Sequence, residues 1–471
     1  MSLPVKVLFY SHMTDIQPSE TTEGWIIVFR KVKDCIMDSK KIVLFALPLA
    51  ATSALEQLFN SIDVAVVGRF ASSEALAAVG ANAPVISLFV TLVVGISLGA
   101  NAILSNYIGQ RDDKGISRCV QTTIYMALWT GVIFMIGGLL VAKNILVAMD
   151  TPKEVVDDAA LYLRIYFLGM PSLVMFNFCS AVLRSVGDTK RPLYILIAAG
   201  MVNTVLNLVF VIVFHLGVAG VAIATAVANT ISAVLTFMVM RGKGGPYRVA
   251  LRKMRFYSNE MKRILNIGVP AGVQGMVFAV SNIIIQSEIN GYGPYAVAGS
   301  AAALNFEYYC YYIISAFNGA AITFIAQNYG AGRYGEVRRV YRLCMLWAMG
   351  LCGFMNVFFV VLNPYFLSLF TADPQVMGYG ADRMLIVLTP QWIACSYEVS
   401  AAALRGMGIS ISPTVLVIFG TCVLRIVWVY VVCPVWHAYD VLMLVYPVSW
   451  AVTGTMVFSL WIWHCRRQGI Y

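Results

Sequence analysis

A few polar and charged side chains lie inside long apolar stretches of this chain, where each one needs an explanation. Glu56 and Asn60 precede Asp63 by seven and three residues, so all three share one face of a helix. Asn203 and Asn207 are four residues apart on another apolar segment and also share a face. An ionisable group within a bilayer costs about 3 kcal/mol on insertion scales, so such groups are candidates for function.

Oxygen atoms from three segments meet at one depth. Thr225 lies about eight residues into its own apolar segment, level with Asp63 and the two asparagines. Carboxylate, amide and hydroxyl oxygens suit a hard cation such as sodium, and they can also surround a carboxylate that takes up a proton. In the alternative interpretation, the asparagines only hydrogen-bond helices together. The predicted cation-coupling residues are Asp63, Glu56, Asn60, Asn203, Asn207 and Thr225, with sodium, if it is the ion, at Asp63, Asn203, Asn207 and Thr225.

Three further ionisable residues lie within apolar segments of the second half: Glu307, Glu398 and Arg425. A carboxylate here would attract an organic cation at low dielectric. The alternative is an internal ion pair between Arg425 and Glu398 or Glu307. The run NFEYYCYY at 305–312 adds aromatic rings suited to cation–π contacts, although helix packing also explains such runs. The predicted substrate cavity is lined by Glu307, Glu398, Arg425, Tyr308 and Tyr309.

The composition indicates which elements position these residues. With 60% hydrophobic residues, 12% charged residues and a mean hydropathy of +0.78, the chain is too apolar for a soluble domain. Each helical crossing needs about 20 apolar residues. Without alternation of polar residues, helices rather than a β-barrel are expected. We predict an all-α integral membrane protein with spans at 42–67, 74–105, 120–142, 159–186, 191–215, 217–241, 264–290, 296–327, 340–363, 378–406, 412–435 and 438–464.

The chain is duplicated. Its matched pairs are LRSVGDTKRP at 183–192 with LRGMGISISP at 404–413, NYIGQR at 106–111 with NYGAGR at 328–333, Pro48 with Pro270, and Pro152 with Pro374, offset by 221 or 222 residues. Six helices per copy make this a parallel repeat around an axis along the membrane normal, with a central cavity. We expect an N-lobe at 42–241 and a C-lobe at 264–464. The position equivalent to Asp63 is Ile285, so coupling should reside in the N-lobe.

The basic residues predict the orientation. Most of the 33 Lys and Arg residues fall on one side, and the other side carries only Arg69, Lys143, Lys153 and Arg383. Both termini should therefore be cytoplasmic, together with the segment 1–41, a basic linker at 242–263 and a tail at 465–471. The net charge of +10 then reflects topology and contact with anionic lipid, and we expect no nucleic-acid partner.

Several motifs together resemble one family. Pro48 to Asp63 followed by VGRFASSEALAAVG, then NYIGQRDDKGISR, LRSVGDTKRP and LGVAGVAIATAVAN, is similar to the multidrug and toxic compound extrusion (MATE) family, in its DinF-like bacterial branch. The resemblance covers about residues 40 to 464. It implies that Asp63 matches the family's first-helix aspartate, and that Asn203, Asn207 and Thr225 match its cation-site positions. Two departures are Asn207, where some members have aspartate, and Glu56, where glutamine is common.

The resemblance implies an antiporter that expels organic, often cationic and amphipathic, compounds in exchange for protons or sodium as its two lobes rock. We expect ion binding at Asp63, helped by Glu56, to lower drug affinity in the outward state. The chain has no GxxxxGK[ST] motif, and its four histidines are dispersed, so we expect neither ATP hydrolysis nor an enzyme. We further expect no cofactor beyond the coupling ion, a monomer, and a place in the plasma or inner membrane. The alternatives are a flippase for lipid-linked sugars and a passive channel.

Overall fold

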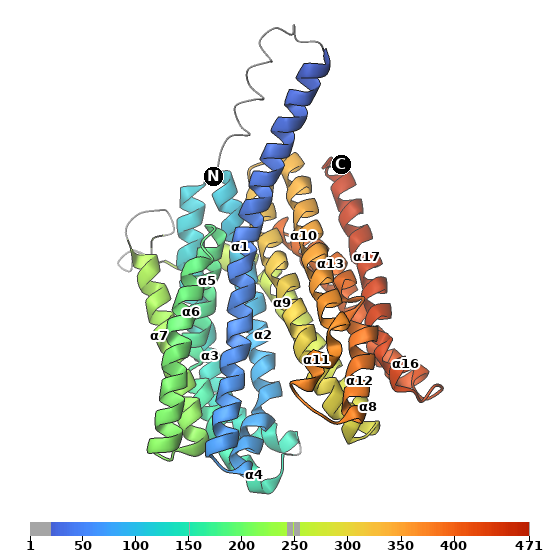
Figure 1. The fold of residues 1–471 in the computed structure, drawn as a ribbon. Helices are drawn as coiled ribbons and strands as arrows, with labels where there is room; N and C mark the ends of the chain where they lie inside the picture. The colour runs from blue at the N-terminus through green and yellow to red at the C-terminus, as the bar shows by residue number, and fades with distance from the viewer. Residues whose placement is uncertain (1–19, 150, 243–247, 249–254, 471) are drawn as a thin grey trace, which may run out of the picture. The chain divides into compact units, whose positions relative to one another are not determined.

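The structure is a computed structural model that describes residues 20–149, 151–242, 248 and 255–470. Residues Met1–Leu44 and Phe45–Tyr471 form two compact units. Parts of the predicted N-terminal segment 1–41 and half of the linker 242–263 lie outside the described residues. Every regular element in the described part of the chain is helical (Figure 1).

The first half contains six spans. They are α1 (Glu20–Phe70), α2 (Ser73–Gln110), α3 (Asp113–Ala148), the pair α4 (Lys153–Leu168) and α5 (Met170–Ser185), α6 (Lys190–Leu208) with the π-turn η1 (Val209–Val213), and α7 (Gly217–Arg241). The second half follows the same plan. Its elements are α8 (Ser258–Gly291), α9 (Pro294–Gly330), α10 (Tyr334–Val361), α11 (Asn363–Ser368), α12 (Pro374–Arg383), η3 (Met384–Leu388), η4 (Gln391–Ile393), α13 (Ala394–Gly406), α14 (Ile411–Val417), η5 (Ile418–Val423), α15 (Leu424–Val427), η6 (Trp428–Val432), α16 (Tyr439–Met443) and α17 (Val445–Arg467).

Two of the twelve spans are broken. Within the described residues, ten helices are long and apolar enough to cross a membrane, and the pair α4–α5, bent by 46°, makes an eleventh. The twelfth runs from α12 to α13, where Pro390 and several charged residues interrupt the apolar helix. It begins at Pro374, the repeat of Pro152, so the two broken spans occupy equivalent places. The predicted fold class, twelve helices in two lobes, is confirmed.

The repeated LRSVG and LRGMG motifs are helix C-caps. Gly187 and Gly408 both have a φ of 89°, a left-handed conformation that favours glycine. The amide of Asp188 donates to the carbonyl of Leu183 over 2.9 Å, and the amide of Ile409 donates to that of Leu404 over the same distance. Each motif therefore ends one span and turns the chain into the next.

The lobes meet along α2, which packs against both α8 and α9. Gly95 allows close approach to α8, since a Cβ there would lie 2.2 Å from the Cα of Gly272. Asn101 on α2 donates from Nδ2 to Oγ1 of Thr323 on α9 over 3.0 Å, and these residues are 222 positions apart. Equivalent positions of the two copies touch each other, so the axis that relates the lobes passes between them.

The two ends of the bundle differ in charge. The end with the α2–α3 and α9–α10 turns, here named the basic end, carries Arg111, Lys114, Lys190, Arg333, Arg338, Arg466 and Arg467. The opposite end, named the acidic end, carries Glu154, Asp157, Asp158, Asp373 and Asp440. In Figure 1 the end of α17 lies at the top, and α4 and α16 lie at the bottom. The predicted charge asymmetry thus coincides with the two ends of the helix bundle.

Candidate functional site

Asp63 accepts hydrogen bonds from two asparagines on α6. Its side chain lies on α1 and is only 8% exposed. Nδ2 of Asn207 donates to Oδ1 of Asp63. The Asn203 amide fits its neighbours with Nδ2 donating to the same oxygen over 2.8 Å and Oδ1 accepting from the backbone nitrogen of Thr225 over 3.3 Å. The two asparagines therefore act on one carboxylate, as their spacing of four residues allows.

A third helix completes the group. The hydroxyl of Thr225 on α7 lies 3.3 Å from Oδ2 of Asp63. Gly200 allows α6 to approach α1 closely, because a Cβ at this position would lie 2.0 Å from the ring of Phe59 on α1. The structure thus brings together four predicted residues, which we name the Asp63 cluster: Asp63, Asn203, Asn207 and Thr225.

The Asp63 cluster has the chemistry of a site for one small cation. Its donors stabilise the ionised carboxylate, and Oδ1 of the fully buried Asn207 has no hydrogen-bond partner among the described residues. If the asparagine amides turned over, their oxygens would face the same point as the carboxylate, an oxygen set that fits sodium. No group of three or more His, Cys, Asp or Glu side chains among the described residues could hold a metal ion. A single carboxylate therefore fits a monovalent ion or a proton.

Glu56 and Asn60 lie outside the cluster. Both side chains are exposed, and neither bonds to Asp63 in the described part of the chain. Seven residues of helix keep Glu56 on the face of Asp63 but separate the two by about 10 Å along the axis. At that depth Glu56 is close enough to Arg184 of α5 for their charges to interact.

Glu307 forms a buried ion pair with a residue that the sequence analysis placed among the outer charges. Arg383 lies at the end of α12 and is only 2% exposed. Its Nε and Nη2 donate to Oε1 and Oε2 of Glu307 over 2.5 and 3.1 Å. Two parallel hydrogen bonds of this kind fix both side chains. The position of Arg383 within the predicted span 378–406 was the available signal for its burial.

The alternative interpretation, an ion pair of Arg425 with Glu398 or Glu307, is not found among the described residues. Arg425 donates to Oγ of Ser449 over 3.1 Å and to Oδ1 of Asn282 over 3.2 Å, and its Nη2 has no partner within the described part of the chain. Its guanidinium lies over the ring of Tyr446, 4.7 Å from the centroid. The guanidinium of Arg425 is therefore surrounded by hydrogen-bond acceptors and an aromatic ring. The carboxylate of Glu307 is bonded to Arg383 instead.

Glu398 has partners of its own in the C-lobe. Nδ2 of Asn318 on α9 donates to its Oε2 over 2.6 Å. The charge of Arg405, two turns further along α13, also acts on it, and Arg405 donates to Gln274 over 2.6 Å. Glu398 is thus held at the meeting point of α8, α9 and α13.

The predicted tyrosines have accessible rings. Tyr308 and Tyr309 are 42% and 45% exposed, and both contact Tyr312. The hydroxyl of Tyr312 donates to Oε1 of Gln57 on α1 over 3.4 Å. This group of rings therefore lies where α9 faces the N-lobe.

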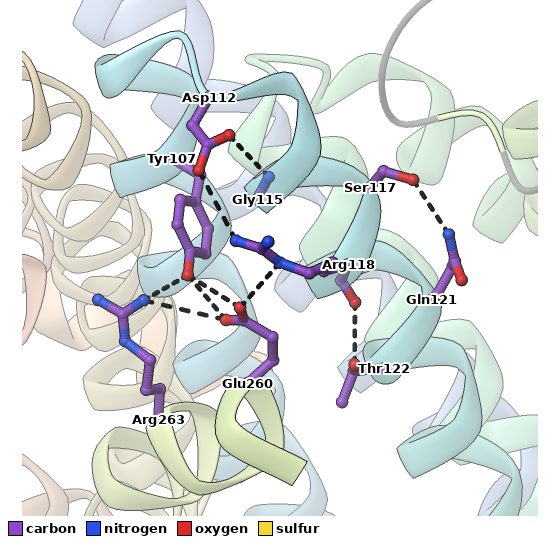
Figure 2. Close-up of polar contacts among 9 residues, drawn as sticks. All are labelled: Tyr107, Asp112, Gly115, Ser117, Arg118, Gln121, Thr122, Glu260 and Arg263. Carbon is purple, nitrogen blue, oxygen red and sulfur yellow. Dashed lines mark hydrogen bonds and ion pairs between the residues drawn. The ribbon is translucent and has the colours of Figure 1, made fainter. Parts of the chain in front are cut away.

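A further polar cluster at the basic end joins the two lobes (Figure 2). Glu260, in the first turn of α8, accepts from the hydroxyl of Tyr107 on α2 over 3.0 and 2.9 Å. Arg118 on α3 lies 3.5 Å from Oε1 of Glu260, and Arg263 lies 4.0 Å from Oε2. Arg263 also donates to the Tyr107 hydroxyl. We name Tyr107, Arg118, Glu260 and Arg263 the basic-end cluster; the sequence analysis missed it, although Tyr107 belongs to a repeated motif.

The chain matches known proteins over most of its length. The MatE family model matches it twice, at residues 48–209 and 270–431. The probable multidrug resistance protein YpnP of Bacillus subtilis (strain 168) is 28% identical over 359 residues, which cover 76% of this chain and 79% of that protein. The probable multidrug resistance protein NorM of Thermotoga maritima is 23% identical over 80% of this chain and 82% of its own length. The two matches of the family model begin at Pro48 and Pro270, the same offset as the sequence repeat.

Solved structures show the same fold. A crystal structure of MATE in the straight conformation superposes with a TM-score of 0.85 at 21% identity, covering 92% of this chain and 97% of that one. The outward-facing conformation of a multidrug resistance MATE family transporter superposes with a TM-score of 0.83 at 20% identity, covering 92% and 96%. At these identities the likeness establishes the architecture alone.

Proposed function

The chain belongs to the MatE family of multidrug efflux transporters, and from that premise we propose that it is an antiporter that exports organic, cationic and amphipathic compounds in exchange for a proton or a sodium ion. The observation that carries the proposal is the Asp63 cluster. One buried carboxylate receives hydrogen bonds from two helices besides its own, so a change in its charge acts on α1, α6 and α7 together.

Coupling requires the ion to bind the two access states with different affinity. A proton on Asp63 would weaken its bonds to Asn203 and Asn207, because those donors bind a carboxylate more strongly than a neutral acid. A sodium ion, held by oxygens of Asp63, Asn203, Asn207 and Thr225, would supply the neutralising charge instead. Either event rearranges the N-lobe. Ile285 occupies the equivalent position in the C-lobe, so the two lobes respond differently.

Substrate binding is assigned to the region where α9 faces the N-lobe. The exposed rings of Tyr308 and Tyr309 suit an organic cation through cation–π contacts. Glu398 and Arg425 lie deeper in the C-lobe and would set the polarity of the substrate-binding region. The carboxylate of Glu307 is already neutralised by Arg383, so we assign it a structural role.

The transporter is proposed to be a monomer in the plasma or inner membrane with its basic end in the cytoplasm. The positive-inside rule supports this orientation, because the described basic residues gather at the end that includes the end of α17. Contact of these basic residues with anionic lipid would further favour this orientation.

The test is export of a cationic dye from proteoliposomes under separately imposed proton and sodium gradients. We expect export to depend on one of them and to fall to background when that gradient is dissipated. Dye movement that follows only its own concentration gradient would indicate a passive channel and overturn the proposal. Transfer of a lipid-linked sugar between leaflets, without dye export, would indicate a flippase instead.

A further inference from the structure

We propose that an open cleft at the acidic end of the N-lobe is the entry site through which a hydrated monovalent cation reaches the Asp63 cluster, with Asp158 as the group that attracts it. The cleft has a volume of about 310 Å³. Its lining includes Phe70, Ser72, Asp158, His215 and Val218. This inference rests on the cation coupling proposed above, and it adds the route by which the cation reaches the Asp63 cluster.

The cleft lies on the same helices as the cluster. Phe70 is two turns beyond Asp63 on α1, and Val218 is two turns before Thr225 on α7. Val211 also lines the cleft and is one turn beyond Asn207. Seven residues of helix span about 10 Å, so the cleft is one to two turns from the cluster on all three helices. A cation in the cleft would therefore lie within about 10 Å of the cluster, measured along the helix axes.

The charges around the cleft favour a cation. Asp157 and Asp158 are neighbours at the start of α4, but Asp157 pairs with Lys143 over 2.6 Å. Asp158 lines the cleft, is exposed, and forms no ion pair with any of the described residues. A carboxylate without a countercharge in the lining of a cleft raises the local concentration of cations.

The backbone holds His215 at the mouth. Its φ is 54°, a left-handed conformation that is uncommon outside glycine. The π-turn η1 precedes it, and the amide of Leu216 donates to the carbonyl of Phe210 over 2.9 Å, which closes the bend. Strained backbone of this kind gathers at functional sites. His215 thus joins Ser72 and Asp158 as a polar residue of the lining.

Access of water to the cleft can be measured without transport. We would compare Ala71→Cys, inside the cleft, with Val213→Cys, which is 65% exposed on η1 and does not line it. The nine described native cysteines are all buried, and the unmodified chain supplies the background. A membrane-impermeant cationic thiol reagent, added at the acidic end, should modify the cleft cysteine at least about tenfold faster than the cysteine at position 213. That position belongs to the candidate membrane span Lys190–Val213, where lipid excludes charge. Equal rates would overturn the inference.

The role of the carboxylate has a matched control. Asp158→Asn should raise the half-saturating concentration of the driving ion, sodium at fixed pH or protons, by about threefold, and leave the maximal rate unchanged. Asp157→Asn, one residue away, should leave both values unchanged. No shift, or the same shift in both variants, would overturn the entry site but not the antiporter. If export by the unmodified protein depended on neither the proton nor the sodium gradient, both the antiporter and the entry site would be overturned.

Discussion

Asp63 is the only carboxylate in its cluster, so its charge decides what the cluster does. We predict that Asp63→Asn reduces gradient-driven export at least about tenfold, because an amide can neither take up a proton nor bind a cation as tightly. The variant keeps the size of the side chain, so the protein should still reach the membrane. Dye export and the amount of protein in the membrane are measured together. Export equal to that of the unmodified chain would contradict the assignment.

Glu307 and Arg383 give a prediction about stability. Glu307→Gln leaves the guanidinium of Arg383 buried without a countercharge, and we expect a loss of about 3 kcal/mol in the free energy of unfolding. Replacing both residues, as Glu307→Gln with Arg383→Met, should recover part of that loss because no unpaired charge remains. The measurement is the thermal unfolding midpoint in detergent. A single variant as stable as the parent would show that the pair contributes nothing.

For single residues, the sequence indicated well which residue types form the site, but it indicated poorly how deep each one lies in the helix bundle. Asp63, Asn203, Asn207 and Thr225 were predicted to meet, and they do. Glu56 shares their helical face but lies two turns away, because periodicity reports the face and not the distance along the axis. The partner of Glu307 was not predicted, since Arg383 was counted among the outer charges and Arg425 was the arginine considered as a partner.

The contact between α2 and α8 depends on glycine. Gly95→Ala would place a Cβ 2.2 Å from the Cα of Gly272, so the two backbones must separate. We predict a loss of about 1–3 kcal/mol in stability, as for other overpacked contacts. Gly80→Ala, on the same helix and with no atom within 4 Å of its Cβ, is the control. Thermal unfolding in detergent should separate the two variants; equal midpoints would mean that α2 and α8 are free to shift.

Element boundaries followed from the sequence where the helices are regular. The repeat offset predicted the paired spans, and the C-caps at Gly187 and Gly408 explain why the LRSVG and LRGMG motifs recur. The breaks between α4 and α5 and between α12 and α13 could not be located, because they depend on how buried charges and prolines are satisfied by neighbouring helices. Arg383 was for this reason placed in an outer loop, whereas it ends a buried helix.

For the whole molecule, the proposed antiport by alternating access would require the lobes to separate at each end in turn. At the basic end the described contacts include the basic-end cluster, in which Glu260 of the C-lobe meets Tyr107 and Arg118 of the N-lobe. Glu260 is only 5% exposed, so these partners replace water around its carboxylate. Opening of the basic end would break these contacts, so we expect their strength to influence how often that end opens.

Glu260→Gln should therefore favour opening. Hydrogen bonds to charged groups contribute about 1.5–3 kcal/mol, and 1.4 kcal/mol is a factor of ten, so we expect at least about a tenfold rise in the open population. The readout is Ser105→Cys, fully buried on α2 near the cluster, which should react faster with a thiol reagent added at the basic end.

Glu336→Gln is the control for this variant, because Glu336 pairs with Arg339 within α10 and does not join the lobes. Tyr107→Phe should raise the reactivity in the same direction, and the double variant Tyr107→Phe with Glu260→Gln should add little to Glu260→Gln alone, since both changes remove one shared contact. Fully additive effects would mean that the tyrosine and the carboxylate act separately. Unchanged reactivity in Glu260→Gln would mean that the close packing of α2 against α8 and α9, rather than this cluster, keeps the basic end closed.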